Sequence, residues 1–133
     1  MSAAKPPVIA IVDDDESVRR ATNMLMVSLG YEAHVFASAE KFLQSPRARD
    51  TSCLILDVQM PQMTGIELQA VLRERGWDIP VIFITAFPSD DIAARATSAG
   101  AACFLVKPFK TQALIDCIDG ALRRRHRETT GPR

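Results

Sequence analysis

Five short apolar runs, each followed by a segment with helical spacing, constrain the fold of this chain more than any other feature. Four of the runs, VIAIV, CLIL, PVIFI and ACFLV, are continuously apolar, and the other, YEAHVF, is typical of an edge strand. Continuous apolar runs of this length, rich in β-branched residues, are typical of strands buried on both faces of a sheet. Strands that alternate with helices form a parallel sheet, joined by right-handed crossovers and covered by helices on both faces. We therefore predict a doubly wound (βα)5 fold of the α/β class.

The segments between the runs carry the signals that begin and end helices. After the first run, apolar residues share one helical face, and Gly30 follows where a glycine commonly ends a helix. Ser38 and Ser89 belong to the residue types that cap helix N-termini. The polar stretch 45–52 predicts a loop. The residues on the first helical face are Val18, Ala21, Leu25 and Leu29.

Length and composition fit one globular domain. The chain has 133 residues, of which 47% are hydrophobic and 24% charged, and its formal net charge is zero. Bulk charge therefore indicates neither a nucleic-acid nor a membrane partner. No apolar run approaches the ~20 residues of a membrane-spanning helix, and no signal-peptide pattern opens the chain. We expect a cytoplasmic protein that does not associate with membranes.

The three cysteines, Cys53, Cys103 and Cys117, are odd in number and scattered. No CxxC pair or cluster of cysteine and histidine accompanies them. We interpret all three as buried apolar thiols in a reducing compartment.

Polar side chains gather where the predicted strands end. Because the carboxyl ends of parallel strands meet at one edge of a sheet, where ligands bind, we expect these side chains to lie close together. They are Asp13, Asp14 and Asp15 after the first run, Asp57 after the third, Thr85 and Ala86 after the fourth, and Lys107 and Pro108 after the fifth.

This set of residues favours phosphoryl chemistry. Several carboxylates within ~6 Å repel one another unless a cation neutralises them. Mg²⁺ suits such an all-oxygen site and keeps water ligands that a phosphate displaces. Asp57 then has the properties of a nucleophile toward a phosphoryl group, with Lys107 and Thr85 offsetting the charge. Each residue alone has an ordinary role as a cap, turn former or surface charge, and only their joint placement indicates a site.

The strings IVDDDE, LILDVQMPQMTGIE, VIFITA and FLVKPF resemble, in this order and spacing, the receiver domain of two-component response regulators, the family of the chemotaxis response regulator. The resemblance implies a flavodoxin-like sheet with strand order 2-1-3-4-5. It also implies a receiver domain over residues 7–123, followed at 124–133 by a basic tail or the start of an interdomain linker. TGIELQ and KPFKTQALIDCI look most like receivers attached to LuxR-type helix-turn-helix domains.

For the metal site, the resemblance implies that Asp57 is the phosphoacceptor. Asp14 and Asp57 would bind Mg²⁺ together with the backbone carbonyl of Gln59, and Asp13 would act through a metal-bound water.

For the phosphoryl group, the resemblance implies contacts from Lys107, Thr85 and Ala86. Thr85 and Phe104 would form the switch pair, and the bond between Lys107 and Pro108 is often cis in this family.

The implied partner is a sensor histidine kinase, and the implied role is that of a stoichiometric phosphoacceptor rather than an enzyme. Phosphorylation would change the surface of the fourth helix, fifth strand and fifth helix. That surface would form a homodimer or control a partner or an attached DNA-binding domain, with no direct nucleic-acid binding by these residues. Whether the chain stands alone or belongs to a longer regulator is open at this stage.

Three alternatives use the same fold or chemistry. A haloacid-dehalogenase-type phosphatase also uses a strand-end Asp with Mg²⁺, but it normally has a second Asp where this chain has Gln59. A binding-only receiver would not need the full set of acids with Thr85 and Lys107. A flavodoxin-like FMN binder needs a Ser/Thr/Gly-rich loop after the first strand, which is absent. Within the receiver hypothesis, Gln59 and Phe87 are candidates for setting the phosphate lifetime, and the bulk of Phe87 also for shaping partner contacts.

Overall fold

The computed structural model describes residues 5–130, with the backbone alone for residues 125–130. Along the chain, strands and helices alternate as the apolar runs predict. The elements are β1 (Val8–Val12), α1 (Glu16–Ser28), β2 (Glu32–Phe36), α2 (Ala39–Gln44), a 3-10 turn η1 (Ala48–Asp50), β3 (Cys53–Asp57), α3 (Gly65–Glu74), β4 (Val81–Thr85), α4 (Asp90–Ser98), β5 (Cys103–Val106) and α5 (Thr111–Thr130).

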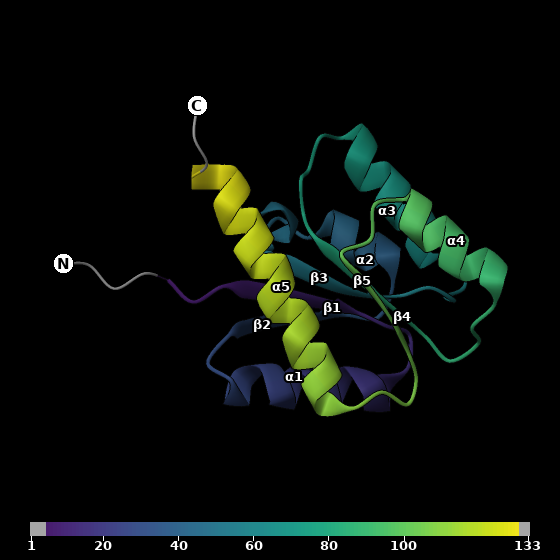
Figure 1. Cartoon of the computed structure of the whole chain (residues 1–133), viewed down its shortest axis with the longest axis horizontal. Coiled ribbons are helices and arrows are strands. Elements are labelled where there is room, and N and C mark those ends of the chain that lie inside the picture. The colour runs from purple at the N-terminus through teal and green to yellow at the C-terminus, as the bar shows by residue number, and fades with distance from the viewer. Residues whose placement is uncertain (1–4, 131–133) are drawn as a thin grey trace.

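The strands form one five-stranded sheet in the order β2-β1-β3-β4-β5, and every neighbouring pair is parallel. This confirms the predicted doubly wound fold with order 2-1-3-4-5. Figure 1 shows the sheet running through the molecule with helices on either side. β2 and β5 are the edge strands, and the chain order reverses between β1 and β3.

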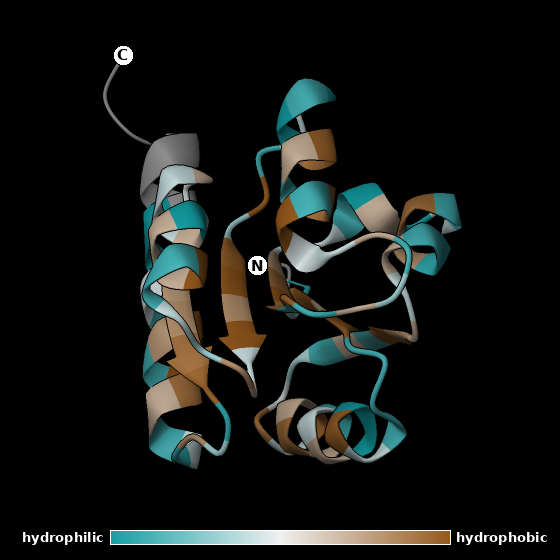
Figure 2. Cartoon of the chain, turned by 90° about the vertical axis from the view of Figure 1, so that its right-hand side faces the viewer, coloured by the Kyte–Doolittle hydropathy of each residue, from teal (hydrophilic) through white to brown (hydrophobic). Residues whose placement is uncertain are grey.

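Alternate residues of each strand enter two separate cores. Ile9 and Ile11 of β1 pack on the side that contains Met26 of α1 and the buried residues of α5. Ala10 and Val12 pack on the opposite side, with the buried residues of α2, α3 and α4. Figure 2 shows the predominantly hydrophobic strands between helices. Burial on both faces is what the unbroken apolar runs indicate.

The predicted signals at the ends of the helices are confirmed. The Ser38 hydroxyl accepts the N–H of Lys41 at the start of α2. Ser89 caps α4 in the same way. Gly30, with φ of 91°, follows the C-cap of α1 in the left-handed region that favours glycine. The predicted loop 45–52 differs in one respect, because it contains η1, where buried Ala48 packs into the core.

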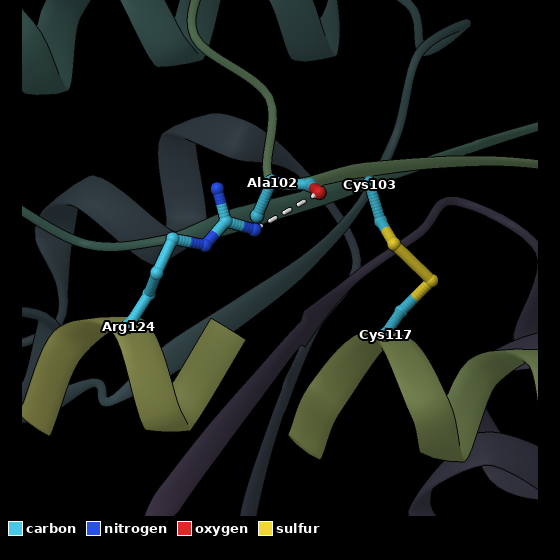
Figure 3. The surroundings of a disulfide bond; sticks show 4 residues. All are labelled: Ala102, Cys103, Cys117 and Arg124. Atoms are coloured by element: carbon cyan, nitrogen blue, oxygen red, sulfur yellow. Dashed lines mark hydrogen bonds between the residues drawn. A yellow bond between two sulfur atoms is a disulfide. The ribbon is translucent and has the colours of Figure 1, made fainter. Parts of the chain in front are cut away.

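The prediction of three buried thiols is wrong for two cysteines. Cys103 of β5 and Cys117 of α5 form a disulfide, with Cα atoms 6.0 Å apart, and both residues are half-buried (Figure 3). Cys53 of β3 is buried and keeps its thiol, as predicted. Packing of α5 against the sheet brings together two residues separated by 14 positions, and their spacing alone carries no pairing signal.

The C-terminal part of the chain is helical beyond the predicted domain boundary. α5 continues to Thr130, and the end of the predicted 124–133 tail lies outside the described residues. The boundary at residue 123 stays a prediction. Within residues 5–130, the helices are too short or too polar to cross a membrane.

Candidate functional site

Three carboxylates meet at the carboxyl edge of the sheet. Asp13 and Asp14 follow β1, and Asp57 ends the neighbouring strand β3, in register with it. One carboxylate oxygen from each lies within 4.8 Å of the others. Asp13 and Asp57 are buried, whereas Asp14 is exposed. The structure therefore brings together the acids that the strand-end pattern predicts.

Asp15, the third acid of the run, faces elsewhere. Its carboxylate caps α1 by accepting the backbone N–H groups of Ser17 and Val18. The Ser17 hydroxyl donates to the same oxygen at 2.7 Å and is the main cause of the lowered pKa of Asp15. Asp15 thus has the structural role of a helix cap, and the site uses the two acids before it.

Lys107 supplies the cation at this edge. Its Nζ lies 3.0 Å from Asp13 Oδ2 and 3.9 Å from Asp57 Oδ2, and most of its side chain is buried. The Lys107–Pro108 peptide bond is cis, as the resemblance implies. The ammonium group of Lys107, which follows β5, therefore faces two buried carboxylates that follow β1 and end β3.

The electrostatics of Asp57 show that Lys107 alone does not balance the acids. Burial, and after it the charge of Asp13, raise the pKa of Asp57 to about 7 against the lowering effect of Lys107. A group with this pKa is partly protonated at neutral pH. Such clustered oxygen ligands fit a hard divalent cation, whose charge would stabilise the ionised form.

The predicted switch residue Thr85 is held by a small ring of hydrogen bonds. Its hydroxyl donates to Gln59 Oε1 and accepts the backbone N–H of Phe87 at 3.0 Å. Gln59 Nε2 in turn donates to the Phe87 carbonyl at 3.3 Å. Thr85 is fully buried at the end of β4. The sequence pattern assigns the Thr85 hydroxyl to a phosphoryl group, but in this structure the hydroxyl is hydrogen-bonded to the Gln59 side chain. No sequence signal predicts this hydrogen bond.

Gly65 is a residue that sequence reasoning missed. It begins α3 and donates its N–H to the Val58 carbonyl at 2.9 Å. A Cβ atom at this position would lie 2.3 Å from the Asp57 carbonyl oxygen. Only glycine allows the helix to approach the backbone of Asp57 this closely. The glycine in the string MTG is the signal that could have indicated this role.

Of the remaining predicted residues, Ala86 and Gln59 lie at the same edge, and Phe104 lies within β5. Ala86 is exposed directly after Thr85 and lines, with Lys107, a groove between α1 and the start of α5. The Gln59 N–H donates to Asp57 Oδ1 at 3.3 Å, which places its backbone beside the acids. Phe104 of β5 pairs with Phe83 and is half-buried against the core on the α3–α4 side.

The fold and the acidic site together define a class of protein, and comparison with known proteins agrees. The family model described as "Response regulator receiver domain" matches residues 9–119. The chain belongs to the family of response regulator receiver domains. Members of this family are phosphorylated by histidine kinases, and they generally serve in phosphorelay signalling rather than in metabolism.

Individual curated proteins are also similar in sequence to this chain. The response regulator protein TodT of Pseudomonas putida is 41% identical over 116 residues, which is 87% of this chain and 51% of that protein. Nodulation protein W of Bradyrhizobium diazoefficiens is 39% identical over 122 residues, or 92% of this chain and 54% of that protein. This chain therefore spans about half the length of the curated relatives it matches.

Solved structures of the family have the same fold. A FixJ-N crystal structure has a TM-score of 0.81 and 32% identity, covering 90% of this chain and 96% of that chain. The response regulator StyR has a TM-score of 0.82 and 45% identity, covering 95% of this chain and 66% of that chain.

Proposed function

We propose that Asp57 accepts a phosphoryl group from a sensor histidine kinase at a site that binds Mg²⁺. Asp14, Asp57 and the backbone carbonyl of Gln59 would hold the ion, and Asp13 would contact it through a water molecule. The observation that carries this proposal is the meeting of three carboxylates within 4.8 Å of one another, opposite Lys107.

The chain's own residues account for most of the transfer step. The ionised Asp57 oxygen forms a bond to phosphorus while the bond from phosphorus to the kinase histidine breaks. Lys107, already within 3.9 Å of Asp57, turns from Asp13 toward the new phosphoryl oxygens. When held by these residues, Mg²⁺ would supply positive charge that favours the ionised form of Asp57 and offsets the charge on the transferring oxygens.

The switch follows from a competition for the Thr85 hydroxyl. A phosphoryl group on Asp57 brings up to two additional negative charges. Thr85 would then leave Gln59 Oε1 and donate to a phosphoryl oxygen, while the Ala86 backbone N–H contacts the same group. Movement of Thr85 frees space for Phe104 to turn inward. The surface formed by α4, β5 and α5 changes as a result.

We further propose that the domain spans residues 7–123 and acts as a stoichiometric phosphoacceptor in the cytoplasm. Its changed surface would form a homodimer or control an output domain. TdiR and FixJ are named as transcriptional regulatory proteins, and this chain matches about half of the length of each. The greater length of these two relatives supports the proposal that an output domain is attached to this receiver domain. That output domain, and not the receiver domain, would bind DNA.

The test is phosphorylation with acetyl phosphate in the presence of Mg²⁺, followed by mass spectrometry. We expect one added phosphoryl group, located on Asp57 and absent from Asp57→Asn. Asp116→Asn, an exposed acid on α5, is the matched control and should be modified normally. Modification of another residue would overturn the assignment. Rapid multiple turnover of phosphate esters would instead favour the dehalogenase-type phosphatase, which family membership argues against.

A further inference from the structure

We propose that Cys103 and Cys117 form a reversible oxidation site whose closure restrains the phosphorylation switch. Oxidation joins β5 to α5 by a disulfide, and reduction leaves two thiols at the same place. The oxidation site itself does not depend on the proposed phosphoryl chemistry. Its coupling to the switch rests on the proposed function.

The two cysteines face each other between the edge strand and the helix that covers it. Cys103 lies on the same face of β5 as Leu105, and both pack against the core on the α1–α5 side. Cys117 lies one helical turn from buried Leu114 and Ala121. The Cα separation of 6.0 Å is within the range that a disulfide spans. Figure 3 shows both side chains crossing the gap between β5 and α5.

We expect the fold to accommodate both oxidation states. α5 is anchored by buried Leu114, Ile118 and Ala121, whatever the state of the cysteines. Arg124 Nη2 also donates to the Ala102 carbonyl at 3.3 Å, a second connection from α5 to the residue before β5 (Figure 3). The disulfide is therefore a tether added to a helix that is already docked.

Half-burial allows exchange with small molecules. Both cysteines are partly exposed, whereas Cys53 is fully buried in β3. A low-molecular-weight disulfide such as oxidised glutathione is the oxidant that we propose. The thiolate of one cysteine attacks a sulfur of that disulfide and releases one small thiol. The other thiolate then attacks the mixed disulfide and releases the second, so that two protein thiols reduce one small disulfide.

The position of the tether connects it to the phosphorylation site. The disulfide closes a ring between residues 103 and 117, and this ring contains Lys107, Pro108 and the first turn of α5. Lys107 pairs with Asp13 and must turn toward a phosphoryl group on Asp57. Phe104, the proposed switch aromatic, also lies within the ring. Because the ring joins the moving residues to docked α5, the oxidised form should change less on phosphorylation than the reduced form.

The first experiment tests the oxidation site alone. The folded protein is incubated with reduced or oxidised glutathione, denatured and alkylated, and its thiols are counted by mass spectrometry. We expect three alkylated thiols after reduction and one after oxidation, with peptides containing Cys103 and Cys117 linked. Cys53→Ala, the control, should lose both of its remaining thiols on oxidation. Cys117→Ser should form no internal bridge. Three thiols in the oxidised parent would overturn the proposal.

The second experiment tests the coupling. Reduced and oxidised protein are phosphorylated with acetyl phosphate and Mg²⁺, and amide hydrogen exchange is compared with that of each unphosphorylated form. We expect the change over residues 103–117 to be at least twofold smaller in the oxidised parent. Cys117→Ser should respond equally under both conditions. Equal responses in the two forms of the parent would refute the coupling. Absence of phosphate on Asp57 in every form would remove both the coupling and the proposed function, while the thiol counts still decide the oxidation site.

Discussion

At the scale of single residues, the site concentrates charge that the folded protein holds at a cost. Asp57 is 5% exposed, and burial is the main reason that its pKa rises to about 7. Its pKa in the unfolded chain is near the ordinary value of 3.8. Between these two values the native state binds more protons than the unfolded state. The free energy of unfolding therefore falls as pH rises from about 4 to 7, and the loss is complete above that range.

Asp57→Asn should remove this loss. We expect the variant to be more stable than the parent by about 2 kcal/mol at pH 8, because one pKa unit corresponds to about 1.4 kcal/mol and neighbouring groups partly relax. The difference should nearly vanish at pH 4. Urea unfolding in the presence of a metal chelator measures both values. Asp116→Asn should show no such pH-dependent gain, and a variant less stable than the parent at pH 8 would contradict the electrostatic account.

Gln59 is the second residue whose role can be separated from the rest of the site. Its amide must release Thr85 before that hydroxyl reaches a phosphoryl group. A hydrogen bond contributes about 1 kcal/mol net. Gln59→Ala should therefore favour the switched state and raise the rate of phosphorylation by acetyl phosphate roughly fivefold. Gln112→Ala, an exposed glutamine on α5, is the control. Rates within twofold of the parent would show that the ring of hydrogen bonds does not restrain Thr85.

The lifetime of the phosphoryl group is a separate measurement, made on Gln59→Ala and Phe87→Ala. Gln59 and Phe87 both lie beside Thr85, and the Phe87 residue is 71% exposed. Phe87→Ala retains the backbone carbonyl that Gln59 contacts. The variant therefore tests the effect of the Phe87 phenyl group alone.

At the scale of elements, the start of α3 positions the end of β3. The Thr64 side chain and Glu67 form a capping box, which fixes where the helix begins. Gly65 then lies against the Asp57 carbonyl. The backbone of the phosphoacceptor is thus set by a helix that contributes no side chain to the acidic cluster.

Gly65→Ala should disturb this contact. The added Cβ would meet backbone atoms that have no rotamer by which to avoid it, so we expect a loss of about 1–3 kcal/mol in stability, as in other overpacked sites. Phosphorylation of Asp57 should slow in parallel. Gly120→Ala is the matched control, because a Cβ on this α5 glycine meets nothing within 4 Å. That change should stabilise the helix by about 0.5–1 kcal/mol. Equal stability of the two variants would show that β3 and α3 separate easily.

The elements themselves were predictable, because burial on two faces leaves an unbroken apolar run and helix ends leave serine and glycine signals. The acidic cluster was predictable for a related reason, since parallel strands must end at one edge. The ring formed by Thr85, Gln59 and Phe87 was not, because it depends on the path of two loops. The pairing of Cys103 with Cys117 also depends on how α5 lies across β5, and it was predicted wrongly.

At the scale of the whole molecule, the two edge strands of the sheet differ in their distance from the phosphorylation switch. β5 lies between α4 and α5 and carries Val106, which is 41% exposed and directly precedes Lys107. β2, at the opposite edge, carries Val35, which is 45% exposed and lies far along the strand order from β5. We therefore expect the proposed switch to act at the β5 edge and not at the β2 edge. An interface that forms on phosphorylation should involve the β5 edge.

Paired substitutions of these two valines test that expectation. With acetyl phosphate and Mg²⁺, the parent should elute from a sizing column as a dimer, and Val106→Lys should remain monomeric because a buried ammonium opposes association. Val35→Lys should dimerise like the parent. Mass spectrometry should find Asp57 equally phosphorylated in all three proteins, which separates the interface from the chemistry. Dimerisation lost in Val35→Lys but kept in Val106→Lys would place the interface at the β2 edge. A phosphorylated parent that stays monomeric would remove the dimer and leave an effector as the partner of this surface.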